Sequence, residues 1–457
     1  MLDKLKSFLS AIRSSLWFVP TLMVGGAAVL AFALVEADKH YQFKWATPFP
    51  LLFGAGAEGS RGMLSTIASS MITIAGLTFS LTIAALVTAS AQYTSRILRN
   101  FMRDRRNQVV LGSFVGIFTY CLVVLRTIRS GDEGAFVPSL AVFVGLLLAL
   151  LGIGVLVFFI HHIATSIQAS TIIASITGET LAAIDERFPK DTQDCEISDD
   201  EVATGADAGT QYRHIVRSDA RGYVQDVEVH RIVEFAARHA ATVRVDVAPG
   251  SFVARDARLL TVLTGAALDD EALEFFRAKV SIRAFRTIDQ EFGFGIRQLV
   301  DIALKALSPG INDTTTAVMC IDHLGAIVAQ LASRPMPVRH RSEDGVVRLV
   351  LLGWSFDDAI ETAFDQIRNN APGNVAVIGH LLGAIAGAAE GTDNGHRRDT
   401  LRLHLGLVAA LAVGTVDIEH DRARLRMRFD EALKVFGQPR RALEPASGTG
   451  RVRDADA

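Results

Sequence analysis

The sequence predicts an α-helical membrane domain with four transmembrane helices, followed by a cytoplasmic mixed α/β domain and a helical C-terminal region. Half of the 457 residues are hydrophobic, and the mean hydropathy of +0.30 is unusually high for a water-soluble chain. Four stretches near the N-terminus carry no charge over about the length that crosses a bilayer. The rest of the chain is more polar and alternates between helix-like and strand-like patterns.

The four uncharged stretches are too long and too uniformly apolar for surface helices with one wet face. No small-residue cleavage site follows the first stretch, so we expect an uncleaved span rather than a signal peptide. The predicted spans cover residues 16–35, 66–89, 109–125 and 137–160.

The connection between the second and third spans is strongly basic. By the positive-inside rule, such a loop stays on the cytoplasmic side of the membrane. With four spans, both termini and everything after residue 163 then also face the cytoplasm. Three scattered cysteines suit this reducing compartment. The arginines of the basic loop are Arg96, Arg99, Arg103, Arg105 and Arg106.

Shifts in composition divide the chain further. An amphipathic helix leaves the membrane and ends before Pro189, and an acidic stretch with little periodicity follows it. We therefore predict a four-span domain (1–163), a membrane-exit helix (164–188), an acidic linker (189–218), a small α/β subdomain (219–290), a mainly helical cytoplasmic subdomain (291–436) and a disordered tail (437–457).

Small and hydroxyl-bearing residues recur along one side of the second span at close to helical spacing. Such a stripe favours helix–helix packing, because small residues let backbones approach closely. Alternatively, it lines a water-accessible path in which hydroxyls replace part of an ion's hydration shell. Both interpretations remain open. The residues are Thr66, Ser69, Thr73, Gly76, Ser80 and Thr88.

The sequence also excludes several classes of function. No charged residue lies near the centre of a predicted span, which argues against an ion-coupled transporter but not against a channel. No phosphate-binding loop, zinc-protease motif or nucleophile elbow occurs. The net charge of −3 predicts no nucleic-acid partner. Because these motifs are missing, we also expect no enzymatic activity, cofactor or metal site.

The segment KALSPGINDTTTAV predicts two helices joined by a turn. Pro309 lacks a backbone donor and Gly310 permits a positive φ, so the first helix ends there. Asn312, Asp313 or a following threonine can then cap the second helix. A functional alternative is that the exposed N–H groups and hydroxyls of this turn hold an anion or a neighbouring chain. The turn comprises Ser308, Pro309, Gly310, Asn312, Asp313 and Thr314.

Two segments, residues 79–127 and 294–318, resemble the signature segments of a bacterial family of predicted membrane proteins, domain of unknown function 2254. The similarity covers nearly the whole chain. Family members usually carry proline after the Asn-Asp pair, where this chain has Thr314; proline suits the first helical position but is not required there. The resemblance implies a multi-pass bacterial membrane protein and implies no activity.

These observations support the hypothesis of an inner-membrane homo-oligomer that conducts or gates a small ion, with a regulatory cytoplasmic domain. A single four-span chain is too thin to enclose a pore, so conduction requires several copies. Its partners would be the lipid bilayer, further copies of the chain and the ion. The alternative is a non-conducting, membrane-anchored sensor or scaffold whose cytoplasmic domain binds a partner or a small ligand.

Overall fold

The computed structural model divides into two compact units, residues 1–171 and 172–457, each described by itself. Arg96, Arg99 and Arg103, most of the predicted acidic linker and the predicted tail beyond residue 437 lie outside the described residues. The structure describes residues 17–41, 56–92, 105–129, 136–188, 211–286, 291–336, 340–343 and 346–437.

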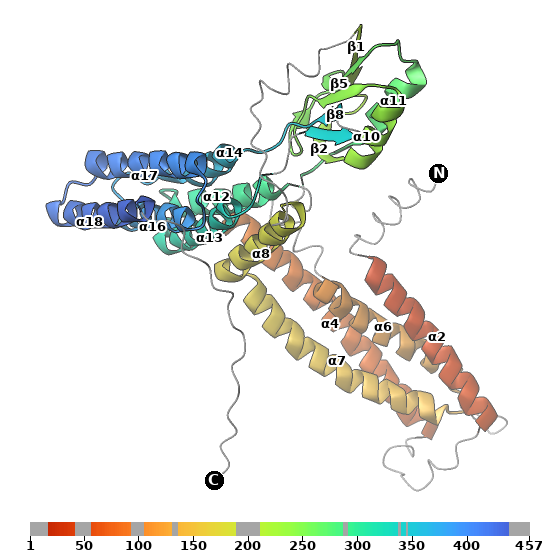
Figure 1. Ribbon diagram of the computed structural model, residues 1–457. Helices are drawn as coiled ribbons and strands as arrows, with labels where there is room; N and C mark the ends of the chain where they lie inside the picture. Colours follow the sequence, from red (N-terminus) through yellow and green to blue (C-terminus); the bar gives the residue numbers. More distant parts are fainter. Residues whose placement is uncertain are drawn as a thin grey trace, which may run out of the picture. The chain divides into compact units, whose positions relative to one another are not determined.

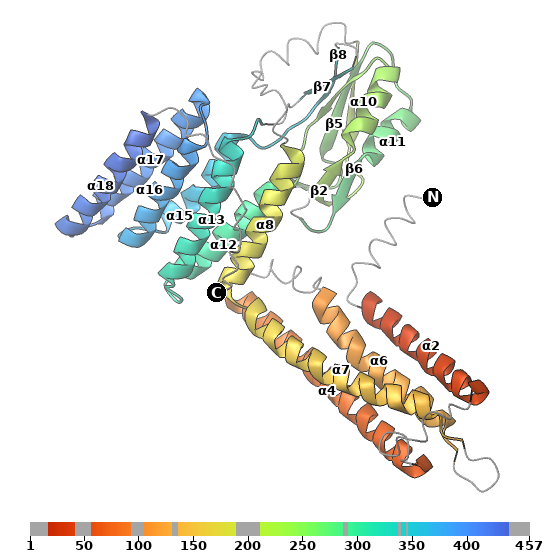
Figure 2. The ribbon, with the colours of Figure 1, turned by 60° about the horizontal axis from the view of Figure 1, so that its bottom comes forward.

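Four long helices lie side by side in the first unit (Figures 1 and 2). Helices α4 and α6 contain the predicted stretches 66–89 and 109–125 and extend beyond them, whereas α2 and α7 begin two residues after the predicted starts at 16 and 137 and end six residues after the predicted ends. The longest has 37 residues and therefore rises about 55 Å at ~1.5 Å per residue, which exceeds the ~30 Å hydrocarbon layer. The helices are α2 (Phe18–Tyr41), α4 (Gly56–Gln92), α6 (Arg105–Thr127) and α7 (Ser139–Ser166).

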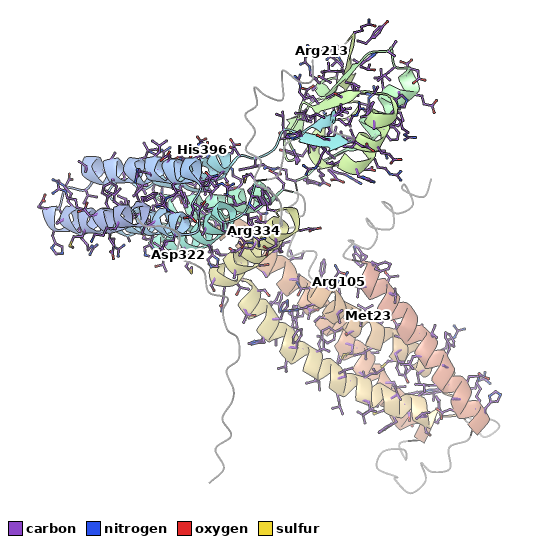
Figure 3. The ribbon with its side chains drawn as sticks, viewed as in Figure 1. Met23, Arg105, Arg213, Asp322, Arg334 and His396 are labelled. Atoms are coloured by element: carbon purple, nitrogen blue, oxygen red, sulfur yellow. The ribbon has the colours of Figure 1, made fainter. Side chains whose placement is uncertain are left out.

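Two glycines one helical turn apart bring α6 close to α2. A Cβ atom on Gly112 would lie 2.7 Å from the Met23 sulfur and 3.0 Å from the Pro20 Cα. At Gly116 the nearest atom would be the Ala27 Cβ at 3.6 Å. Figure 3 labels Met23 on α2. Because lipid offers no hydrophobic drive between helices, such close backbone contact is what holds them together.

The start of α7 is capped from another helix. Its own N-cap residue, Pro138, makes no side-chain hydrogen bond. Instead, the buried carboxylate of Asp38 on α2 accepts hydrogen bonds from the backbone N–H groups of Leu140 (3.3 Å) and Ala141 (3.1 Å). The Tyr120 hydroxyl of α6 donates to the Ala141 carbonyl at 2.7 Å. One helix end therefore joins three helices, with orphan N–H groups satisfied by a carboxylate.

The predicted continuous exit helix is wrong at one point. Helix α7 runs on to Ser166, the chain turns at residues 167–168, and α8 (Ala169–Arg187) begins afresh. The Ser166 hydroxyl donates to the His162 carbonyl at 2.7 Å, which competes with the backbone bonds that would continue the helix. Helix α8 ends two residues before Pro189, as a proline requires.

The second unit contains a five-stranded sheet. Its strands are antiparallel except for β3 and β8, which pair in parallel. Helices α10 (Val229–Arg238) and α11 (Asp270–Ala278) pack against it (Figure 1). The strand order is β1 (Tyr212–Arg217), β5 (Arg258–Thr264), β3 (Thr242–Val245), β8 (Val346–Val350) and β7 (His340–Glu343), and a smaller sheet has β4 (Phe252–Val253), β2 (Gly222–Val227) and β6 (Val280–Arg283).

The sheet crosses two predicted boundaries. Strand β1 lies inside the stretch predicted as linker; Val216 is its one buried residue, so its sequence shows no clear alternation. Strands β7 and β8 come from the region predicted as mainly helical, yet Val243 of β3 pairs with Leu349 of β8. Helices α12 and α13 are thus inserted between strands of one sheet.

The rest of the second unit is helical, as predicted for the C-terminal region. Helix α16 packs against α13, α17 and α18. The elements are α12 (Phe292–Leu307), α13 (Thr314–Ala332), α14 (Phe356–Ile360), the π-helix η2 (Glu361–Asp365), α15 (Gln366–Asn369), α16 (Val375–Glu390), α17 (Gly395–Thr415) and α18 (Glu419–Phe436).

Five helices in the described part of the chain are long and apolar enough to cross a membrane: α2, α4, α6, α7 and, beyond the four predicted spans, α13. Cys320, Leu324 and Val328 recur along α13 at helical spacing. All three side chains are fully buried. Its other sides also carry small or apolar residues, which is why length and composition alone mark it as a candidate span.

The glycine contacts predict a specific packing defect. We expect Gly112→Leu to lower the thermal stability of the detergent-solubilised chain, at a cost of about 1–3 kcal/mol for overpacking. The matched control is Gly154→Leu on α7, where an added Cβ would meet no atom within 4 Å. Equal melting temperatures for the two variants, measured by intrinsic fluorescence, would show that α2 and α6 do not meet at Gly112.

Candidate functional site

The polar stripe of α4 faces away from the helices of its own bundle. All six of its predicted residues are exposed, whereas residues such as Leu64, Met71 and Ala75 are buried against the bundle. An added Cβ at Gly76 would meet no atom within 4 Å. In the described part of the chain, the stripe is therefore not a helix-packing surface within the bundle. The stripe residues are Thr66, Ser69, Thr73, Gly76, Ser80 and Thr88.

Hydroxyls along the stripe donate to their own helix. Thr73 Oγ1 donates to the Ser69 carbonyl at 2.8 Å and Ser80 Oγ to the Gly76 carbonyl at 2.9 Å, and Thr66 and Thr88 do the same four residues back. A hydroxyl whose proton is used this way still has acceptor lone pairs. The stripe therefore offers oxygen acceptors, which suit cations better than anions.

The basic end of the bundle is partly described. Arg105 and Arg106 form the start of α6 and are exposed; Arg105 is labelled in Figure 3. They lie at the end where α2 and α6 begin and where α4 and α7 end.

The turn between α12 and α13 is closed by Ser308. Its carbonyl accepts hydrogen bonds from the N–H groups of Ile311 (3.0 Å) and Asn312 (2.9 Å). The positive φ of the turn, +50°, occurs at Asn312. The prediction of a positive φ at Gly310 is wrong. Asn312 adopts it instead, since asparagine also tolerates the left-handed region.

Asp313 is the residue that caps α13. Its carboxylate accepts from the Thr316 N–H at 3.0 Å and from the Thr316 hydroxyl at 2.6 Å. These bonds hold the pKa of Asp313 below its usual value. A carboxylate thus already occupies the helix N-terminus, which disfavours the anion-binding alternative.

Thr314 links two helix N-termini. Its hydroxyl accepts a hydrogen bond from Asn374 Nδ2 at 3.3 Å. Asn374 in turn caps α16 by accepting from the Val377 N–H at 3.2 Å. The turn therefore fastens α13 to α16.

A cavity of about 300 Å³ lies in the second unit beside an ion pair between half-buried Arg286 and buried Glu291. Arg286 Nε donates to Glu291 at 2.9 Å, and a second guanidinium nitrogen bonds the other carboxylate oxygen. Burial raises the pKa of Glu291, and Arg286 opposes that shift. At Gly250, with φ +84°, a Cβ would collide with the Glu291 carboxylate. The cavity is also lined by Ser251, Trp354, Asp358, Glu361 and Thr362.

The π-helix η2 connects this cavity to a buried histidine. Glu361 and Thr362 of η2 line the cavity, while Asp365 at its end pairs with Arg368 (3.2 Å) and His404 (3.3 Å). His404 is 4% exposed. Burial lowers its pKa, and the Asp365 carboxylate opposes that shift. Such π-helical turns are frequent at functional sites.

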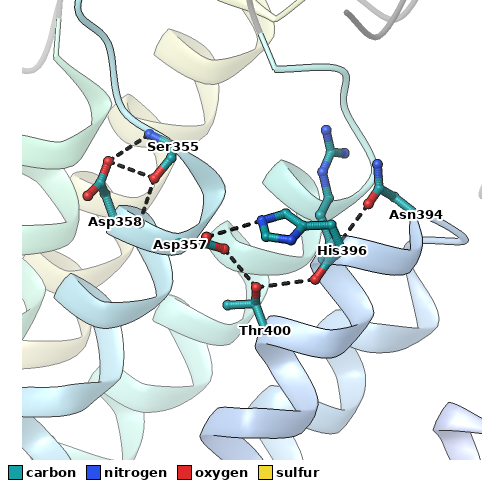
Figure 4. Close-up of polar contacts among 7 residues, drawn as sticks. Ser355, Asp357, Asp358, Asn394, His396 and Thr400 are labelled. Carbon is teal, nitrogen blue, oxygen red and sulfur yellow. Dashed lines mark hydrogen bonds and ion pairs between the residues drawn. The ribbon is translucent and has the colours of Figure 1, made fainter. Parts of the chain in front are cut away.

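A third polar group fastens α14 to α17 (Figure 4). The Asp357 carboxylate contacts His396 Nε2 at 3.1 Å and accepts from the Thr400 hydroxyl at 2.7 Å. The carboxylate, not the imidazole, touches the hydroxyl, so the histidine has no role as a base toward Thr400. Among the described residues, no cluster of His, Cys, Asp or Glu could hold a metal ion.

Sequence patterns missed these polar groups. Arg286 and Glu291 flank residues 287–290, which lie outside the described part, and nothing in their spacing indicates a pair. Asp365 and His404 are separated by 38 residues and meet only through helix packing. A lone histidine within an apolar helical stretch, as in LRLHLGLV, is the signal that His404 offered.

Together, the apolar helical bundle and the α/β-helical unit define a multi-pass α-helical membrane protein. The chain belongs to the family described as predicted membrane protein (DUF2254), whose model matches residues 13–387. Uncharacterized proteins of Mycobacterium tuberculosis and Mycobacterium bovis are 33% identical over 469 residues, covering 100% of this chain and 87% of each relative. No solved structure matches the chain. The resemblance noted in the sequence is thereby confirmed, and with it a membrane location.

The cap on α13 predicts a stability effect with a defined pH dependence. Asp313→Ala should destabilise the chain by about 1 kcal/mol at neutral pH. Because the folded pKa lies below the unfolded value of about 3.9, the stabilisation is present above pH 4 and is lost as pH falls through the folded pKa. Chemical denaturation at pH 7 and pH 3 measures it, with Glu431→Ala, an exposed position on α18, as the control. A difference between wild type and Asp313→Ala that does not shrink in acid would contradict this role.

The buried histidine predicts a second pH effect. Since the folded pKa of His404 is lowered, the unfolded chain binds more protons just below the ordinary value of about 6.5. Stability should therefore fall as pH drops from 6.5 through the folded pKa. His404→Phe should flatten this slope in melting curves, whereas Leu403→Phe, at an exposed position of the same helix, should keep it. Identical slopes for wild type and His404→Phe would rule the effect out.

Proposed function

We propose that this protein is a homo-oligomeric, channel-like protein of the bacterial inner membrane, in which α2, α4, α6 and α7 are the spans and the second unit is cytoplasmic and regulatory. The observation that carries the proposal is the outward-facing polar side of α4. In the described part of the chain, the stripe residues are exposed and face away from the other helices of the bundle. A row of hydroxyls and glycine on a helix surface is also less favourable in contact with lipid than apolar side chains would be.

The fifth candidate, α13, belongs on this proposal to the cytoplasmic unit. Polar side chains surround its C-terminal end: Gln330 donates to Asp185 of α8 at 2.7 Å, and Arg334 pairs with the same carboxylate. Buried Arg397 of α17 donates to the Ala332 carbonyl at 3.1 Å. Figure 3 labels Asp322 on α13 and Arg334 two residues beyond its end. Ion pairs of this kind are expensive in hydrocarbon and ordinary in a water-soluble domain.

The orientation follows from the arginines between α4 and α6, which favour the cytoplasmic side. With four spans, both termini and the second unit share that side. Several copies would then place their α4 helices around one axis, as closed oligomers do. The acceptor oxygens of the stripe would line the path, so we propose that it passes small cations rather than anions.

Ion flux through liposomes tests the proposal. The double variant Thr73→Leu, Ser80→Leu should assemble normally but conduct at least tenfold less than wild type, because its two hydroxyls are replaced by apolar side chains. The control is Ile72→Leu at a neighbouring exposed position. Reversal potentials in asymmetric KCl should show cation preference. No flux from wild type under varied voltage, tension and pH would overturn a conducting role.

The alternative, a non-conducting sensor or scaffold, is favoured by the cavity next to Arg286 and Glu291. Its lining offers both charge signs, which suits a small polar ligand. In that case the α4 stripe joins copies only, and Thr73→Leu with Ser80→Leu would disrupt the oligomer. Size-exclusion chromatography with light scattering on the same variant therefore separates the two functions.

A further inference from the structure

A second cavity, of about 180 Å³, lies within the first unit among α4, α6 and α7. It is comparable in size with engineered apolar cavities of roughly 150 Å³ that bind benzene. Most of its walls are apolar. It is lined by Trp17, Thr78, Phe79, Thr82, Ile83, Leu86, Asn107, Gln108, Val110, Leu111 and Phe159.

An amide with no partner lines this cavity. Asn107 is 7% exposed, and neither its side-chain nitrogen nor its oxygen has a hydrogen-bond partner. Burying an amide in this way is unfavourable, because its donor and acceptor lose their bonds to water without replacement. Such a group in a folded protein calls for a ligand that supplies its bonds.

The surroundings select the chemistry of that ligand. Water would find few polar partners among these side chains, whereas a hydrocarbon chain fits them. Asn107 follows directly after exposed Arg105 and Arg106, and Trp17 is an aromatic residue of the kind found at membrane interfaces. Positive charge, a donor–acceptor amide and an apolar cavity follow one another, as the phosphate, the glycerol ester and the acyl chain do in a phospholipid.

We propose that this cavity binds an anionic phospholipid with a hydroxyl-bearing headgroup. One acyl chain enters between Ile83, Leu111 and Phe159. Asn107 Nδ2 donates to an oxygen of the phosphate or the ester, and Asn107 Oδ1 accepts from a headgroup hydroxyl. Arg105 and Arg106 attract the phosphate charge. The lipid thereby bridges three helices, and the site does not depend on whether the protein conducts ions.

Native mass spectrometry of the full chain in detergent tests the site. After equilibration with phosphatidylglycerol or phosphatidylcholine, wild type should retain phosphatidylglycerol about tenfold better, the equivalent of one charge-assisted hydrogen bond. Asn107→Leu should reduce phosphatidylglycerol retention to the phosphatidylcholine level. Its lipid-free melting temperature should stay level or rise, because the variant no longer buries an unpaired amide.

Two further variants keep the test decisive. Ile83→Trp fills the cavity from an exposed position of α4 and should reduce the retention of both lipids. Ser113→Leu lies on α6 outside the cavity lining and should behave as wild type. Unchanged phosphatidylglycerol retention in Asn107→Leu, or equal retention of the two lipids by wild type, would overturn the proposal.

Discussion

Hydrocarbon contains no water to bond an exposed N–H or carbonyl group, and this constraint shapes the whole first unit. Its helices satisfy their backbones internally, and the exceptions are supplied by neighbours, as when Asp38 caps α7. The same solvent removes the hydrophobic drive between helices, so α2 and α6 meet through the small residues Gly112 and Gly116. The stripe hydroxyls of α4 likewise donate hydrogen bonds to backbone carbonyls of their own helix. What remains unsatisfied in this unit, Asn107 above all, therefore stands out.

The second unit is built by the opposite rule, since burial of apolar side chains drives its assembly. Helix α13 is long and apolar enough to cross a membrane, but α12 and α16 pack against it and charged side chains lie at its C-terminal end, which is why we propose that it belongs to a cytoplasmic unit. Caps set where its helices begin. Asp313 starts α13, Asn374 starts α16, and the bond between Asn374 and Thr314 ties the two together. The turn between α12 and α13 resembles a ligand-binding loop, but its polar side chains cap α13 and fasten it to α16.

The candidate sites differ in whether their polar side chains have hydrogen-bond or ion-pair partners. Of the carboxylates that line the cavity of about 300 Å³, Glu291 is paired with Arg286 and Asp358 accepts hydrogen bonds from Ser355. The hydroxyls of the α4 stripe bond to their own helix while the stripe is exposed, which is why we propose it as a surface for assembly or permeation. Because the mycobacterial relatives align with the whole chain, both units are common to them.

The sequence by itself determined the features that depend on a short window: the uncharged lengths of α2, α4, α6 and α7, the apolar face of α13, and a cap within Asn312–Thr316. The features that depend on residues far apart in the sequence appear only in the folded chain. Strand β8 joins β3 across more than a hundred residues, which no local alternation signals. Likewise, only the packed bundle shows that the α4 stripe faces outward and that Asn107 is buried, because burial is a property of the neighbours a residue meets.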